Sequence, residues 1–166
     1  MSRSGRIFRH LRTPLWRTRR RFGPDVLAEI EEAIRTAEAD HEGEIRFVIE
    51  SSLDLPRLLA GQTPRQRALE LFGQLGIWDT AGNSGVLLYV LAADCGVEIV
   101  ADRGIAAHVP PAQWVAVCRQ MEALFRAGQF GEGAVTGVRA TGALLARHFP
   151  HAGEAADELP NRPLLL

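Results

Sequence analysis

The spacing of apolar residues along the chain predicts helices and strands in the order α-β-α-β-β-α-α. Apolar residues recur every three or four positions, the period of an amphipathic helix, over about 24–40, 63–75, 110–128 and 131–148. Residues 45–50 alternate in the manner of a strand, and 97–101 form a second short apolar strand after a turn. Residues 86–92 are nearly all apolar, which is typical of a strand buried on both faces.

Local signals support several of these boundaries. Pro24 suits the first position of a helix, because the amide that proline lacks has no partner there. Thr63 and Gln66 have the spacing of a capping box at the start of the helix over 63–75, and Gly76 suits the end of the same helix. Gly137 and Gly142 weaken the last helix as isolated residues, so we expect them to mark close packing against another backbone.

These elements predict an α/β fold: a mixed β-sheet that contains a β-hairpin and is flanked by helices on both faces, as a three-layer sandwich. The first two strands are joined through a helix, which makes them parallel if they share a sheet. We divide the chain into a flexible basic arm over 1–22, an α/β domain over 23–150 and a C-terminal tail over 151–166.

Charge is distributed unevenly along the chain. The net charge is −1, but residues 1–22 contain eight arginines and no acid, whereas the rest contains eleven arginines and twenty acids. A basic arm on an acidic domain can bind anionic lipid or nucleic acid, or fold back on its own domain. Apolar residues between these arginines favour an anionic membrane over duplex DNA as the partner of the arm, and a solvated tail is the alternative. The chain contains no lysine, so the choice of arginine carries little weight. The eight arginines are Arg3, Arg6, Arg9, Arg12, Arg17, Arg19, Arg20 and Arg21.

Cysteine usage and hydropathy indicate a compartment. Cys95 and Cys118 are too few for a disulfide scaffold, and we expect reduced thiols. No run approaches the roughly 18 apolar residues of a membrane span, and the N-terminus lacks the apolar core of a secretory signal. We therefore expect a cytoplasmic protein, peripheral to the inner face of the membrane through its arm.

Polar residues at the strand ends give one candidate site. A tight hairpin returns the end of the 97–101 strand to the start of the 86–92 strand. If the 45–50 strand is parallel to 86–92, its start lies at the same edge of the sheet, so polar side chains at these three points should lie close together. Carboxylate and amide oxygens suit a hard cation such as Ca²⁺ or Mg²⁺, although the spacing is not that of an EF-hand. The alternative is that these residues only form turns and caps. The candidate metal ligands are Asp79, Asn83, Asp102 and Glu44.

Signs of nucleophilic catalysis are weak. The chain lacks the spacing of a cysteine phosphatase loop, a nucleophile elbow, a zincin helix and a phosphate-binding loop. His108 follows Asp102 and can approach the candidate site, but a solvated loop histidine is the simpler interpretation. Trp114 lies on a helix stripe, which favours the core.

Several segments together resemble the TPM domain family, most closely its short bacterial branch. They are the entry Gly76-Ile77-Trp78-Asp79, the strand Asn83-Ser84-Gly85-Val86-Leu87-Leu88, the hairpin exit Asp102-Arg103-Gly104-Ile105, the first-strand segment His41-Glu42-Gly43-Glu44-Ile45-Arg46-Phe47, Trp114, and the closing Leu144-Leu145-Ala146-Arg147-His148-Phe149-Pro150.

The resemblance implies an α/β sandwich over about 24–150, in a family whose members include acid phosphatases and calcium binders. The resemblance permits both activities. We expect a non-catalytic, divalent-cation-dependent binding or accessory module that serves a membrane- or envelope-associated assembly through an unidentified protein partner, with the basic arm as its tether. The alternative function is a metal-assisted phosphatase, in which Asp79 and Asp102 hold the cation and Arg103 neutralises phosphate charge.

Overall fold

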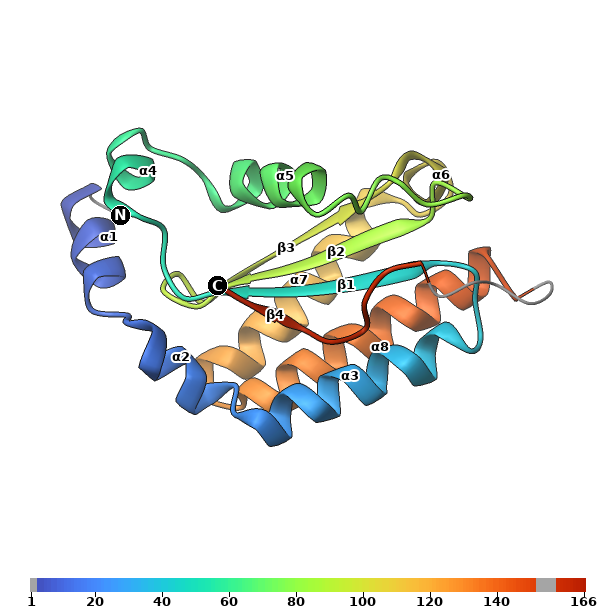
Figure 1. Ribbon diagram of the computed structural model, residues 1–166, viewed down its shortest axis with the longest axis horizontal. Helices are drawn as coiled ribbons and strands as arrows, with labels where there is room; N and C mark the ends of the chain where they lie inside the picture. The colour runs from blue at the N-terminus through green and yellow to red at the C-terminus, as the bar shows by residue number, and fades with distance from the viewer. Residues whose placement is uncertain (1–2, 152–157) are drawn as a thin grey trace.

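Four strands form one open, mixed sheet in the order β3-β2-β1-β4 (Figure 1). The computed structural model describes residues 3–151 and 158–166. The strands are β1 (Glu44–Glu50), β2 (Gly85–Leu91), β3 (Gly96–Ala101) and β4 (Leu164–Leu165). β1 is parallel to β2 and β4, and β2 is antiparallel to β3. The predicted mixed sheet with a hairpin and a parallel crossover is confirmed.

Helices cover both faces of this sheet, so the predicted three-layer sandwich is also confirmed (Figure 1). One face packs against α3 (Pro24–Glu38), α7 (Pro111–Arg126) and α8 (Phe130–His148). The other packs against α4 (Leu55–Leu59) and α5 (Pro64–Gln74). Within the described residues, none of the helices has the length and apolar character needed to cross a membrane.

Both central strands are more deeply buried than simple alternation suggests. All seven residues of β2 are buried, as its apolar run predicts. In β1 only Arg46 is partly exposed, although its alternation suggested one polar face. The second face is covered because Val48 packs with apolar residues from α4 and α5. A strand with helices on both sides has no solvent-facing side.

The expected capping box is present, and the two glycines of α8 mark close packing, although their nearest neighbours are mainly side chains and not another backbone. Thr63 accepts a hydrogen bond from the Gln66 amide, and the Gln66 side chain accepts one from the Thr63 amide. A Cβ atom added at Gly137 would lie 2.2 Å from Met121 Sδ, and one at Gly142 would lie 2.6 Å from Ala37 Cβ. The absence of a side chain at both glycines allows α8 to lie this close to α7 and α3.

The two ends of the chain differ from their expected forms. The segment predicted as a flexible arm forms two helices, α1 (Arg3–Leu11) and α2 (Leu15–Arg21). Ile7 packs on the core cluster beneath α4 and α5, and Phe22 is buried in the other cluster, so apolar contacts hold both ends of the arm. From the predicted tail, β4 pairs with the edge of β1.

Candidate functional site

Three strand ends meet at one edge of the sheet, as predicted. Glu44 at the start of β1 is in register with Gly85 at the start of β2. The Asp102 amide donates to the Gly85 carbonyl oxygen at 2.9 Å, which places the end of β3 beside them. We call this the amino-end edge, because β1 and β2 both begin here.

Asp102 is a buried polar group of this edge. It precedes the short helix α6 (Arg103–Ala106), and its Oδ1 accepts a hydrogen bond from the Arg103 amide at 2.7 Å. Asp102 is only 6% exposed, and its Oδ2 atom is buried with no hydrogen-bond partner among the described residues. The turn-and-cap interpretation therefore accounts for one oxygen of this carboxylate and leaves the other unexplained.

Backbone carbonyl oxygens also lie close to the start of α6. Asn83 has a φ of 49°, in the left-handed region, and its carbonyl oxygen accepts from the Gly104 amide at 3.1 Å. A Cβ atom added at Gly104 would lie 2.6 Å from the Asn83 oxygen and 2.8 Å from the Gly82 oxygen. His108 is exposed and reaches this region through its Nδ1 atom, 3.0 Å from the Gly104 oxygen. Only a glycine allows α6 to begin this close to the loop.

The other two predicted ligands are placed less favourably. Glu44 is buried at the edge, but its Oε2 accepts a hydrogen bond from the Leu159 amide at 3.1 Å. Asp79 is exposed, and its amide closes a turn onto the Gly76 oxygen. Over residues 3–151 and 158–166, no three acidic, histidine or cysteine side chains converge closely enough to hold a metal ion. The edge gathers Glu44, Asn83 and Asp102 but not a complete carboxylate shell.

The opposite end of the sheet holds a polar cluster that the sequence did not reveal. Glu50 ends β1 and accepts two hydrogen bonds from Arg67, each at 3.0 Å, and one from the Tyr89 hydroxyl at 2.6 Å. All three side chains are buried. Burial, followed by the negative charge of Glu50, raises the pKa of Tyr89 well above its usual value. The guanidinium group balances the buried carboxylate, so this cluster is internally satisfied.

Helix α1 contributes a second cluster at this end, around Asp94 in the hairpin turn. Asp94 lies 3.1 Å from Arg6 Nε, 2.5 Å from Arg9 Nη2 and 3.2 Å from His10 Nε2. His10 is buried, and its Nδ1 accepts from the Leu53 amide at 3.0 Å. Burial alone would raise the pKa of Asp94, but the hydrogen bond and charge of His10 and the charge of Arg6 lower it to about 2. These contacts fix α1 to the domain.

The remaining candidate groups have structural surroundings. Trp114 is buried in the core, as expected. Burial, with the nearby charges of Glu98 and Glu122, raises the pKa of Cys118 to about 12. This thiol is therefore protonated at neutral pH, which is unsuitable for a nucleophile.

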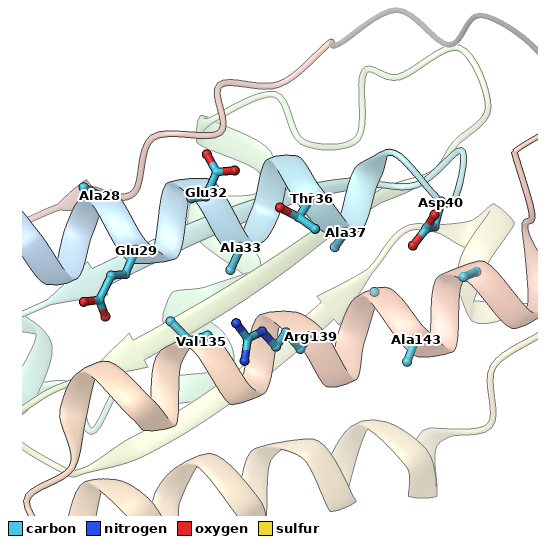
Figure 2. A pocket seen from close by; sticks show the side chains of 12 residues that line it. Ala28, Glu29, Glu32, Ala33, Thr36, Ala37, Asp40, Val135, Arg139 and Ala143 are labelled. Atoms are coloured by element: carbon cyan, nitrogen blue, oxygen red, sulfur yellow. The ribbon is translucent and has the colours of Figure 1, made fainter.

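A groove of about 780 Å³ runs between α3 and α8 (Figure 2). Small side chains such as Ala33 and Ala143 line it, with Glu29 and Asp40 on the α3 side and Arg139 on the α8 side. The groove contains none of the four predicted ligands, so it is separate from the amino-end edge.

Comparisons with known proteins agree on one family. A family model described as the TPM domain matches residues 20–144. The NMR structure of the BA42 protein from the psychrophilic bacterium Bizionia argentinensis matches with a TM-score of 0.75 and 31% sequence identity, over 85% of this chain and 92% of that one. No curated protein matches the chain. The family match begins at residue 20, so α1 lies outside it.

Proposed function

Because this chain belongs to the TPM domain family, we propose that it is a non-catalytic binding module that takes a divalent cation at its amino-end edge. The observation that carries the proposal is the Oδ2 atom of Asp102, which is buried without a hydrogen-bond partner among the described residues. A carboxylate oxygen removed from water loses much of its hydration and gains nothing in return unless a donor or a cation replaces it. A bound cation supplies that missing partner.

The donor chemistry at the edge suits a hard cation. Carboxylate, amide and backbone carbonyl oxygens are the ligands that Ca²⁺ and Mg²⁺ prefer. Asp102 provides the charged oxygen, and the loop at Asn83 brings carbonyl oxygens to the start of α6. The gathered residues supply fewer than the six or more oxygens that Ca²⁺ takes, so water completes the shell in this proposal. The cation neutralises Asp102 and links the loop to the hairpin exit.

The test is a calorimetric titration of Ca²⁺ and Mg²⁺ into wild type and Asp102→Asn. The asparagine keeps an oxygen that can accept from the Arg103 amide but replaces the second oxygen with an NH₂ group. We expect saturable binding to wild type and a loss of affinity of more than about tenfold in the variant, because the charged ligand is gone. Absence of heat from wild type up to millimolar cation overturns the proposal.

Asp54 provides a matched control. It also precedes a short helix and accepts a hydrogen bond from the amide three positions later, Arg57, at 3.0 Å, but it is exposed. Asp54→Asn removes one surface charge while leaving the amino-end edge intact. We expect it to bind the cation as wild type does. Equal losses in both variants would mean that binding follows overall charge and not this site.

The phosphatase alternative makes a separate prediction. A metal-assisted phosphatase would hydrolyse p-nitrophenyl phosphate in the presence of the cation and lose this activity in Asp102→Asn. Turnover by wild type that is lost in the variant would overturn the non-catalytic part of the proposal while leaving the cation site in place. We expect cation binding without turnover.

A further inference from the structure

The outer face of α1 and α2 carries an unusual concentration of exposed apolar side chains. Leu11 is 67% exposed, Trp16 62%, Phe8 60% and Leu15 36%, all within nine consecutive positions. Isolated surface apolar residues are ordinary, but a cluster of large ones indicates an interaction surface. We propose that this face binds the surface of an anionic lipid membrane. The proposal uses a different surface from the cation site and does not depend on it.

The domain holds the inner face of these helices, so the outer face is presented in a fixed way. Arg6 and Arg9 contact Asp94, and Arg6 also donates to the Gln62 carbonyl oxygen at 2.8 Å. Thr18 is fully buried on the inner side of α2, and Phe22 packs in the core after it. Two of the arginines are therefore engaged internally, and the apolar cluster faces outward on a preformed scaffold.

Arginines accompany the apolar side chains on the exposed side. The guanidinium of Arg12 lies over the Phe8 ring at 5.2 Å from its centroid, and that of Arg17 lies over the Trp16 ring at 5.6 Å. Arg19 and Arg20 are also exposed on α2. The side chain of Arg3 lies outside those that the structure describes. In this combination the guanidinium groups can lie among the lipid headgroups while the aromatic rings reach the boundary of the acyl chains.

Charge complementarity selects an anionic surface and sets the orientation. Outside residues 1–22 the chain has eleven arginines against twenty acids, so an anionic membrane repels the body of the domain. The arm has eight arginines and no acid. A lipid surface also accommodates the apolar side chains of Phe8, Leu11 and Trp16, whereas duplex nucleic acid offers them no apolar environment. The molecule therefore approaches with α1 and α2 first and the amino-end edge exposed to solvent.

Flotation of the full chain with vesicles tests this inference. We expect co-flotation with vesicles of phosphatidylcholine and phosphatidylglycerol, and little with phosphatidylcholine alone. Arg12→Glu/Arg17→Glu should weaken binding by more than about tenfold, because each basic residue near an anionic surface contributes to attraction. Phe8→Ser/Trp16→Ser should weaken it comparably at unchanged charge. All four side chains are exposed, so circular dichroism and thermal melting should match wild type.

Matched controls locate the effect. Arg119→Glu/Arg147→Glu makes the same change in charge at exposed positions on α7 and α8, and Leu69→Ser/Val115→Ser makes the same apolar-to-polar change on α5 and α7. Both controls should float as wild type does. Equal binding to neutral and anionic vesicles, equal losses in variants and controls, or binding of a duplex oligonucleotide without vesicle binding would each overturn the inference.

Discussion

The two ends of the sheet differ in the partners that they provide for a buried carboxylate. At the carboxyl ends of β1 and β2, Glu50 is held by Arg67 and Tyr89, and Asp94 is surrounded by cationic side chains of α1. At the amino-end edge, Asp102 keeps one oxygen that none of the described residues contacts by a hydrogen bond. Both carboxylates of the first end have cationic partners within the chain, whereas the second end leaves one buried carboxylate oxygen without a hydrogen-bond partner among the described residues.

This difference reverses the usual arrangement of α/β proteins. Ligands commonly bind at the carboxyl ends of parallel strands. Here that end is filled by a guanidinium group from α5 and by α1, so the chain supplies its own counter-charges. A buried carboxylate that keeps its charge needs a cation. Among the described residues, no cationic side chain contacts Asp102 at the amino-end edge, which is why we propose that the cation binds there.

The largest effect is expected at the carboxyl end. Glu50→Ala leaves the buried guanidinium of Arg67 without its main partner and the Tyr89 hydroxyl without an acceptor. Breaking a buried ion pair in this way typically lowers the free energy of unfolding by about 3–5 kcal/mol. Urea denaturation followed by circular dichroism measures this change. A loss below about 1 kcal/mol would show that water reaches the cluster and screens it.

An exposed ion pair on α3 provides the control for this measurement. Arg35 contacts Glu31 and Glu32, and more than half of its side chain is exposed. Arg35→Ala should change stability by less than about 1 kcal/mol, because surface pairs are screened by solvent.

The next effect concerns the packing of the amino-end edge. Gly104→Ala would place a Cβ atom against two backbone oxygens, which cannot move as a side chain can. Overpacking of this kind lowers the free energy of unfolding by about 1–3 kcal/mol. It should also weaken cation binding, because the loop and the start of α6 must separate. Thermal melting and calorimetry measure the two consequences.

Gly73→Ala is the control for this substitution. A Cβ atom at this position on α5 meets nothing within 4 Å. Alanine favours helix over glycine by about 1 kcal/mol, so the variant should be as stable as wild type or more so. A cost equal to that of Gly104→Ala would contradict the steric explanation.

The two ends should also lose stability in different pH ranges. His41 precedes β1 and is almost fully buried, and burial lowers its pKa from the usual 6.5. Below pH 6.5 the imidazole of His41 is therefore protonated in the unfolded chain but remains neutral in the folded chain. The free energy of unfolding should fall with decreasing pH, by up to about 1.4 kcal/mol per pH unit, until the pH reaches the folded pKa. The charges of Asp40 and His151 modulate this shift.

Asp94 at the carboxyl end titrates much lower. Its pKa is lowered from 3.8 to about 2, so its contribution is present above pH 3.8 and is lost as the pH falls toward 2. Urea denaturation across both ranges separates the two groups. His41→Asn should remove only the upper dependence and Asp94→Asn only the lower. A single transition common to both variants would contradict the assignment to separate ends.

Much of the fold could be predicted from the sequence because its elements have strong local signals. The capping box at Thr63 and the apolar run over 86–92 identified α5 and β2 correctly. The meeting of Asp102 with the start of β2 followed from the hairpin, since a two-stranded turn fixes which ends adjoin. The start of β1 joined them through the predicted parallel crossover.

The rest depended on contacts that local patterns do not encode. Glu50 is 17 positions from Arg67 and 39 from Tyr89, and each is unremarkable in its own segment. The docking of α1 on Asp94 joins the first helix to a distant turn. The Leu159 amide that donates a hydrogen bond to Glu44 comes from the C-terminal tail, where the prolines gave no indication of this contact. The exposure of Asp79 depended on the loop conformation.

The smallest effect is expected for Asp79, and it sharpens the definition of the amino-end edge. Asp79 is exposed on the turn that follows α5. Asp79→Ala should change the free energy of unfolding by less than about 0.5 kcal/mol, as most surface substitutions do. Cation affinity should stay close to wild type, because the proposed site depends on Asp102 and the carbonyl oxygens near Gly104. A loss of affinity as large as that of Asp102→Asn would instead mean that the loop carrying Asp79 closes over the cation, which would restore the four-residue site predicted from the sequence.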